Sequence, residues 1–436
     1  MYIILLIGII LGGLAIGRNY DKHFYNPITL FNLIWLMSII LLVFGLNYGI
    51  DMPTEKAFLI TIIGLISFNM ASFIMTLNKR KTAFSFGRKS GYFDPRINVP
   101  LLKFFIVLTL VLSFMRYATV AMQLLRGETN FAIIREEFFE SNIHFIDAFF
   151  IFPMRYALIV CLASCFIKKE ILELGKKYYI AMFVIIALTF LSSGGRSILV
   201  NGLYVILCAV GIYSTNHHIL FKTKLKILLI TIAFISLVVF VTSNRSWSFM
   251  SLGYESVLER NLITFVSYFS GGIVYLGKVI SSTSLECSTY GLITIHGFLY
   301  PLYIILGYMG LFDTPQFIID YNQLSNEVVI IGNGIPFNAF MTAFGSFYAD
   351  FGFSGVFIYS ALFSIITISV YKQIYWDEGE RNINMLGTSA YLIMIIILCG
   401  FSQRWMMASS EYALIFIYMK IMFAKSRIDI HMKRNI

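Results

Sequence analysis

The sequence predicts an all-α polytopic membrane protein, and three observations lead to that class. Of the 436 residues, 58% are hydrophobic and 13% are charged, and the mean hydropathy is +0.79. A soluble domain carries about 25% charged residues, so this composition excludes an ordinary soluble protein. Apolar runs near 20 residues, the length that crosses a bilayer, recur along the chain. A single membrane domain, residues 1–436, accounts for the whole length.

Eleven apolar segments are expected to cross the membrane as helices. In chain order they are residues 2–17, 28–46, 57–77, 104–125, 148–167, 178–193, 197–213, 227–243, 352–371, 385–401 and 409–424. The first lacks a basic leader and a small-residue cleavage site, so no cleavable signal peptide is expected. The segments therefore describe one multi-pass bundle.

Basic residues set the expected orientation of this bundle. With successive loops on alternate sides, 22 Lys and Arg residues fall on one side, 8 on the other and 3 within spans. Cytoplasmic loops carry the excess of Lys and Arg, so the side with 22 is cytoplasmic. The C-terminus is then inside and, with an odd number of spans, the N-terminus is outside.

The longest loop, residues 244–351, faces outward in this topology. Its stretches 262–280 and 290–310 are apolar and rich in Tyr, Phe and Gly. They could be a further pair of spans, which would give thirteen, or interfacial or re-entrant helices over the bundle. Either alternative leaves the topology of the other segments unchanged.

Six of the eight outer basic residues are arginines. Outer arginines do not set orientation, whereas a guanidinium group binds phosphate oxygens in pairs and stays charged. Arg196, Arg245, Arg260 and Arg404 are therefore candidates for binding a phosphate-bearing substrate at the outer surface. Arg116 and Arg155 lie within spans, where charge marks function by default, but both are near enough to the outer end to snorkel.

The setting of each outer arginine suggests a role and an alternative. Arg196 follows two glycines, and Ser197 can cap the next helix, which together make an anion site; a plain capped hairpin is the alternative. Arg245 and Arg404 are near Trp247 and Trp405, whose indole faces suit a sugar ring or an interfacial anchor.

The long outer loop holds three more candidates beside Arg260. Glu255 precedes Arg260 in YESVLERN, where local ion pairing is the alternative to substrate binding. His296 could act as an acid or base, although a lone histidine is more often structural. Asp350 could orient an arginine or a substrate hydroxyl, or could cap a helix. Because no Cys/His spacing suggests a metal site and no nucleotide-binding motif is present, no cofactor is expected.

The ordered pattern resembles the bacterial O-antigen and capsular oligosaccharide repeat-unit polymerases. It consists of an early basic loop, GGRS at an outer turn, one long outer loop, and NAFMTAFGSFYADFGFSG before the last spans. The resemblance covers nearly the whole chain, maps the family's outer arginines onto Arg196, Arg245 and Arg404, and fixes neither His296 nor Asp350.

This resemblance implies a metal-independent glycosyltransferase of the bacterial inner membrane. Its donor and acceptor would be undecaprenyl-diphosphate-linked oligosaccharides, with membrane lipid and a chain-length regulator protein as partners and no nucleic acid. The donor diphosphate would be the leaving group, stabilised by preorganised arginines. Three alternatives stay open: an O-antigen ligase, a lipid-linked oligosaccharide flippase, and a structural partner of a glycan assembly complex.

Overall fold

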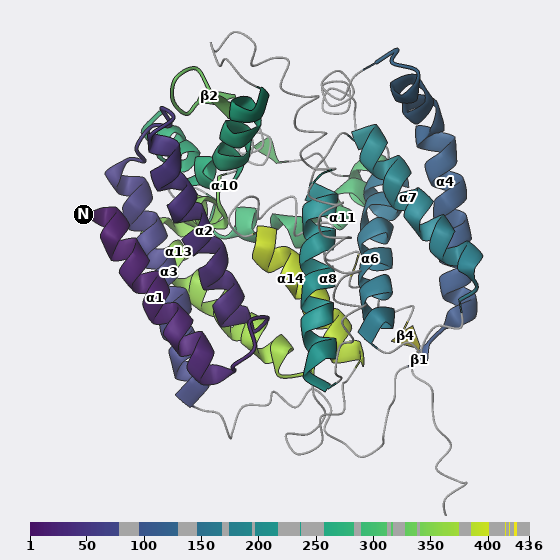
Figure 1. Ribbon diagram of the computed structural model, residues 1–436, viewed down its shortest axis with the longest axis horizontal. Helices are drawn as coiled ribbons and strands as arrows, with labels where there is room; N and C mark the ends of the chain where they lie inside the picture. Colours follow the sequence, from purple (N-terminus) through teal and green to yellow (C-terminus); the bar gives the residue numbers. More distant parts are fainter. Residues whose placement is uncertain are drawn as a thin grey trace, which may run out of the picture.

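The computed structural model is a bundle of helices (Figure 1). It describes residues 1–77, 96–129, 146–167, 174–193, 197–216, 257–282, 289–311, 328–337, 341–374 and 385–400, with residues 236, 315–316, 415, 418 and 423–424. By length and composition, six of the described helices can cross a membrane: α1 (Tyr2–Tyr20), α2 (Pro27–Leu46), α3 (Glu55–Leu77), α4 (Val99–Leu125), α10 (Val257–Ser282) and α13 (Ala343–Tyr371). The predicted helical class is confirmed at this level.

Shorter elements complete the described part of the bundle. They are the π-helical turn η1 (Asp147–Ile151) and the helices α6 (Phe152–Ile167), α7 (Lys176–Ser193), α8 (Ser197–Asn216), α11 (Leu292–Tyr308) and α14 (Met385–Gly400). Two antiparallel pairs join β1 (Arg96–Ile97) to β4 (Phe423–Ala424), and β2 (Val329–Ile330) to β3 (Pro336–Phe337). Of the predicted spans, 227–243 and 409–424 lie outside the described residues except for isolated positions.

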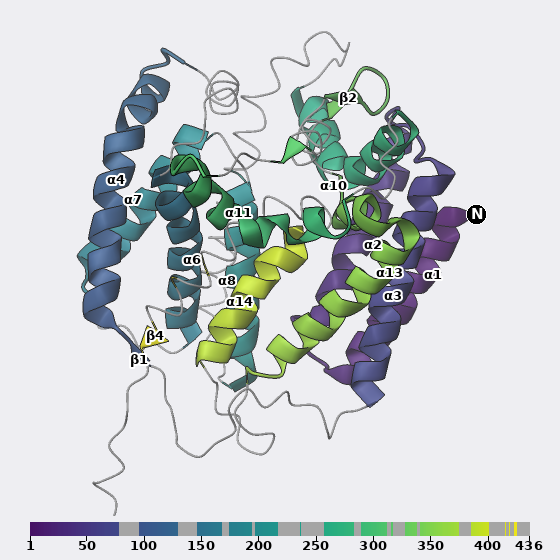
Figure 2. The same cartoon turned by 180° about the vertical axis from the view of Figure 1, so that it is seen from behind.

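One group of helices consists of α1, α2, α3 and α13, which pack side by side (Figures 1 and 2). Buried amides of Asn32 and Asn69 donate to each other's carbonyl oxygens, at 2.9 and 3.1 Å. Hydroxyls of Ser72 and Ser364 lie 2.8 Å apart between α3 and α13. Such hydrogen bonds between buried polar side chains hold helices together where lipid weakens the hydrophobic driving force.

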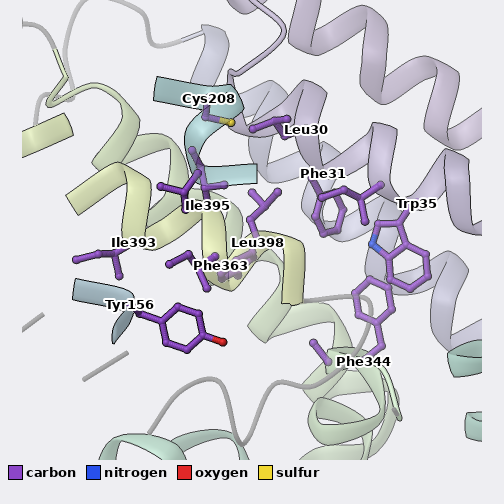
Figure 3. Close-up of a cluster of buried hydrophobic side chains, with 14 of the residues drawn as sticks. Leu30, Phe31, Trp35, Tyr156, Cys208, Phe344, Phe363, Ile393, Ile395 and Leu398 are labelled. Atoms are coloured by element: carbon purple, nitrogen blue, oxygen red, sulfur yellow. The ribbon is translucent and has the colours of Figure 1, made fainter. Parts of the chain in front are cut away.

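A second group consists of α4, α6, α7 and α8, and α14 lies between the two groups (Figure 2). The Ser164 and Ser389 hydroxyls, 3.0 Å apart, join α6 to α14. Figure 3 shows the buried core where the groups meet, with Trp35 stacked on Phe344 at a ring distance of 5.0 Å. The core therefore runs continuously from α2 through α14 to α6 and α8.

The bundle has two ends, named here by their strand pairs. The β1–β4 end also holds the turn between α1 and α2, to which α14 is tied because the Tyr391 hydroxyl donates to the carbonyl of Tyr25. The β2–β3 end holds α10 and the turn between α2 and α3 (Figure 1). The described C-terminal ends of α3 and α8, which precede basic segments predicted to be cytoplasmic, lie at the β1–β4 end, so the β2–β3 end corresponds to the predicted outer side.

Helix α10 is packed on the turn between α2 and α3. Val266 lies beside Gly45 near the end of α2, since a Cβ placed on Gly45 would be 3.0 Å from Cγ1 of Val266. Eleven residues later, Gly277 lies against Thr54 at the start of α3. The Lys278 ammonium pairs with Asp51 in the same turn. The C-terminal half of α10 therefore contacts the turn between α2 and α3. Because α10 is also long and apolar enough to cross a membrane, both alternatives for residues 262–280, a span and an interfacial helix, stay open.

Candidate functional site

A hydrogen-bonded charge pair joins α4 to the start of η1. Nη2 of Arg116 donates to Oδ2 of Asp147 at 2.9 Å, and the Tyr117 hydroxyl donates to Oδ1 at 2.6 Å. The Asp147 side chain is 7% exposed, whereas the Arg116 side chain is 39% exposed. The carboxylate is thus buried with both oxygens hydrogen-bonded, while the guanidinium group reaches the surface.

Arg155 contributes a second buried cation beside this pair. Its guanidinium carbon lies 4.5 Å from the ring centre of Phe152 and 5.0 Å from that of Tyr156, a cation–π arrangement. Phe152 also packs on Tyr117, so the two arginines share one cluster. Arg155 is 7% exposed, so its guanidinium group lies among side chains of the bundle, and whether it reaches the outer interface stays a prediction. The described cluster thus brings together Arg116, Asp147 and Arg155 between α4, η1 and α6.

The cluster lies within α4 and at the start of a π-helical turn. Arg116 lies nine residues before the end of α4, roughly 13 Å along a helix of 1.5 Å rise per residue. Asp147 opens a π-helical turn, a feature that often marks functional sites. Arg116 and Arg155 are noticeable in the sequence as charges within apolar spans, whereas Tyr117 and Asp147 are not. The position of Arg116 inside an apolar run was the signal that could have indicated this pair, because a charge within a span needs a partner.

Asp350 serves as the cap of another helix. It is fully buried, and its carboxylate accepts hydrogen bonds from the Thr289 hydroxyl at 2.6 Å and from the backbone N–H groups of Ile293 and Thr294 at 3.0 and 2.8 Å. The last two belong to the first turn of α11, whose own N-cap, Gly291, has no side chain to offer. A carboxylate at a helix N-terminus is favoured by the helix dipole. The capping alternative thus accounts for Asp350, and its catalytic role stays a prediction.

A kink in α13 positions this cap. Phe351 and Gly352 leave helical geometry, and Gly352 has φ 60° and ψ −143°, which a side chain would strain. The predicted span 352–371 begins at this kink, and the preceding turns, residues 343–350, are buried. The kink separates a buried N-terminal arm carrying Asp350 from a long apolar helix.

His296 lies one turn further along α11. Its side chain is 3% exposed, and its ring stacks on Tyr303 at 5.6 Å. Burial lowers the pKa of His296 to about 4, so its imidazole is neutral near pH 7. A neutral imidazole can accept a proton but cannot serve as a fixed cation for phosphate.

The remaining candidates lie at or beyond the edges of the described residues. Arg196, Arg245, Trp247, Glu255, Arg404 and Trp405 fall outside them. For Ser197 and Arg260 only the backbone is described, at the start of α8 and within α10. The C-terminal ends of α7 and α14, which precede Arg196 and Arg404 in the chain, both point away from the β1–β4 end (Figure 1).

Within the part of the chain that the structure describes, no three His, Cys, Asp or Glu side chains gather as metal ligands would. No family model, curated protein or solved structure matches the chain.

Proposed function

We propose that this chain polymerises oligosaccharide repeat units linked to undecaprenyl diphosphate, at the outer face of a bacterial plasma membrane. The observation that carries the proposal is the predominance of arginine over lysine on the predicted outer side, where six of the eight basic residues are arginines. Arginine is the residue that recognises phosphate with two parallel hydrogen bonds. A helical bundle with six described helices able to cross a membrane supports a substrate that is itself embedded in lipid.

The reaction needs no separate energy source. A hydroxyl oxygen of the acceptor unit attacks the anomeric carbon of the growing glycan, and the bond from that carbon to the lipid diphosphate breaks. The electron pair leaves with the diphosphate, and the hydroxyl proton passes to a base. Arginines fixed beside the diphosphate would stabilise its developing charge, with Arg196, Arg245 and Arg404 as the candidates and Arg260 with Ser197 in support.

The candidate bases are His296, Glu255 and Asp350. To accept a proton, Asp350 would have to give up part of a three-donor hydrogen-bond set in a fully buried site. Those donors hold the first turn of α11, so the hydrogen bonds of Asp350 are already used in capping that helix. These contacts favour a structural role for Asp350, and His296 and Glu255 stay as the other candidate bases.

Reconstitution tests the proposal. Purified protein in proteoliposomes, given single lipid-linked repeat units and excess chelator, should produce a ladder of longer glycans on a gel. Transfer of one unit to a lipid A core and no ladder would identify a ligase. Movement of the units across the bilayer without any new glycosidic bond would identify a flippase.

A further inference from the structure

We propose that Lys103, Lys176 and Lys177 bind the head group of an anionic phospholipid where α4 and α7 begin. The ammonium nitrogen of Lys103 on α4 lies 5.5 Å from the ring centre of Tyr178 on α7, and that of Lys177 lies 5.3 Å from the same ring centre. An aromatic face attracts a cation at such distances. One tyrosine ring therefore brings together a cation from each helix, and Lys176 adjoins them as the first residue of α7.

The region around these lysines is basic, whichever way the undescribed residues are arranged. Three segments of the chain adjoin the β1–β4 end, where α4 begins (Figure 1). Residues 78–103 contain seven basic residues and one acidic residue, residues 168–177 contain four and two, and residues 425–436 contain four and one. Basic residues outnumber acidic ones in each segment, so the acidic residues of these segments cannot neutralise them. An anion is therefore the favoured ligand.

The ends of the two helices add to this preference for an anion. A helix N-terminus carries a partial positive charge, so acidic side chains are favourable in the first turn and basic ones are not. Neither α4 nor α7 has an acidic residue in its first turn, and α7 begins with two lysines. In the part of the chain that the structure describes, none of the three lysines forms a salt bridge. A bound anion would offset the unfavourable placement of these charges.

The surface of α4 beyond Lys103 is apolar. Val107, Val111 and Phe114 follow Lys103 at intervals of four, four and three residues, which places all of them on one face of the helix. The three apolar side chains are exposed. Helix α4 therefore presents a cation near its start and a continuous apolar strip after it.

Helix α7 repeats this arrangement. Ile180 and Phe183 follow Lys176 at intervals of four and three residues, and both are exposed. A phospholipid matches the two helices together, because its anionic head group can lie at the lysines while its acyl chains cover the apolar strips. A soluble anion would leave both strips uncovered. This inference does not depend on the proposed polymerase activity.

Native mass spectrometry of the full-length protein in detergent tests the site with defined probes. Phosphatidylglycerol supplies a net negative head group, phosphatidylethanolamine with the same acyl chains supplies a phosphate balanced by its own ammonium, and inorganic phosphate lacks the lipid. We expect the protein to prefer phosphatidylglycerol. The double variant Lys103→Gln/Lys177→Gln should weaken binding of that lipid by roughly tenfold or more, because two cations next to one anionic head group are lost.

A charge-matched control separates this site from the general basicity of the β1–β4 end. Arg18→Gln/Lys22→Gln also removes two exposed basic residues, at the turn between α1 and α2 at the same end. It should bind phosphatidylglycerol as wild type does. If Lys103→Gln/Lys177→Gln fails to fold, Lys176→Gln/Lys177→Gln changes two exposed positions and should weaken binding in the same direction.

Tyr178 provides a second, independent test of the shared ring. Tyr178→Phe keeps the aromatic face and should keep the affinity for phosphatidylglycerol, whereas Tyr178→Leu keeps both lysines without the ring and should lower it severalfold. Four results would overturn the proposal: unchanged binding in the lysine variants, equal loss in the control, equal affinity for phosphatidylethanolamine, or displacement of phosphatidylglycerol by equimolar inorganic phosphate. Equal binding by Tyr178→Phe and Tyr178→Leu would overturn the role of the ring.

Discussion

Oδ2 of Asp147 accepts a hydrogen bond from Nη2 of Arg116 at 2.9 Å, across the contact between η1 and α4. The aspartate is nearly buried and the arginine is not. The pair therefore joins α4 to η1 through the buried carboxylate of Asp147. It also leaves part of the Arg116 guanidinium group exposed at the surface of the bundle.

Removing the carboxylate should destabilise the protein. Asp147→Ala deletes the partner of Arg116 and of the Tyr117 hydroxyl, and hydrogen bonds to charged groups contribute about 1.5–3 kcal/mol each. Because Arg116 is partly exposed and can find water, we expect a total near the lower part of that range. Thermal unfolding in detergent measures it, with Glu128→Ala as the control. Equal melting temperatures for the two variants would mean that the pair contributes nothing.

Asp350 offers a test that separates a cap from a base. Asp350→Asn keeps the size of the side chain but removes its charge from the N-terminus of α11, and losing an N-cap costs about 0.5–2 kcal/mol. We expect a lower melting temperature together with reduced polymer, and Thr289→Val should lower the melting temperature in the same direction. Loss of all polymer with an unchanged melting temperature would instead make Asp350 the catalytic base.

The kink in α13 should depend on glycine. Gly352 has φ 60° and ψ −143°, and a Cβ in such a region costs on the order of 1–3 kcal/mol. Gly352→Ala should therefore lower the melting temperature by several degrees. Gly8→Ala on α1 is the control, since no atom lies within 4 Å of the position its Cβ would take. A Gly352→Ala protein as stable as the control would show that α13 does not need this kink.

The outer arginines should act by forked hydrogen bonding and not by charge alone. Arg196→Lys and Arg404→Lys keep the charge and lose the fork. Each should reduce polymer yield by roughly tenfold or more, the effect of about 1.4 kcal/mol of lost transition-state stabilisation, with the protein level in the membrane unchanged. Near-normal polymer from both lysine variants would reduce these residues to membrane anchors.

Orientation can be tested by fusions. Alkaline phosphatase, which is active only outside the cytoplasm, should be active after Asn322 and inactive after Arg88 or Arg434. This follows from 22 basic residues on the predicted inner side against 8 on the outer side. An active fusion at Arg88 would reverse the topology and move the outer arginines to the cytoplasm.

Much of the helix layout was predictable because long apolar runs carry a strong signal. The predicted spans 28–46, 57–77 and 178–193 match α2, α3 and α7 to within two residues. The strand pairs and the placement of α10 were not predictable in the same way. They depend on contacts between distant segments, such as Lys278 with Asp51, that no local pattern encodes.

The site was harder to predict than the fold for the same reason. Arg116 stood out in its apolar run, but its partner Asp147 is 31 residues away, beyond a loop of unremarkable composition. Asp350 was noticed for its flanking glycines, yet its use as a cap depends on Thr289 and on the start of α11, more than fifty residues earlier. Residue type identified the candidates, whereas their roles depend on three-dimensional neighbours.

The most direct measurement is the length of the surface glycan in cells that lack this protein. If it polymerises lipid-linked repeat units, such cells should still make, export and attach single units, so each acceptor should carry one. Loss of a ligase would leave long polymer on undecaprenyl diphosphate, and loss of a flippase would trap single units inside. Full-length polymer on the acceptor in the deletion strain would contradict the polymerase proposal.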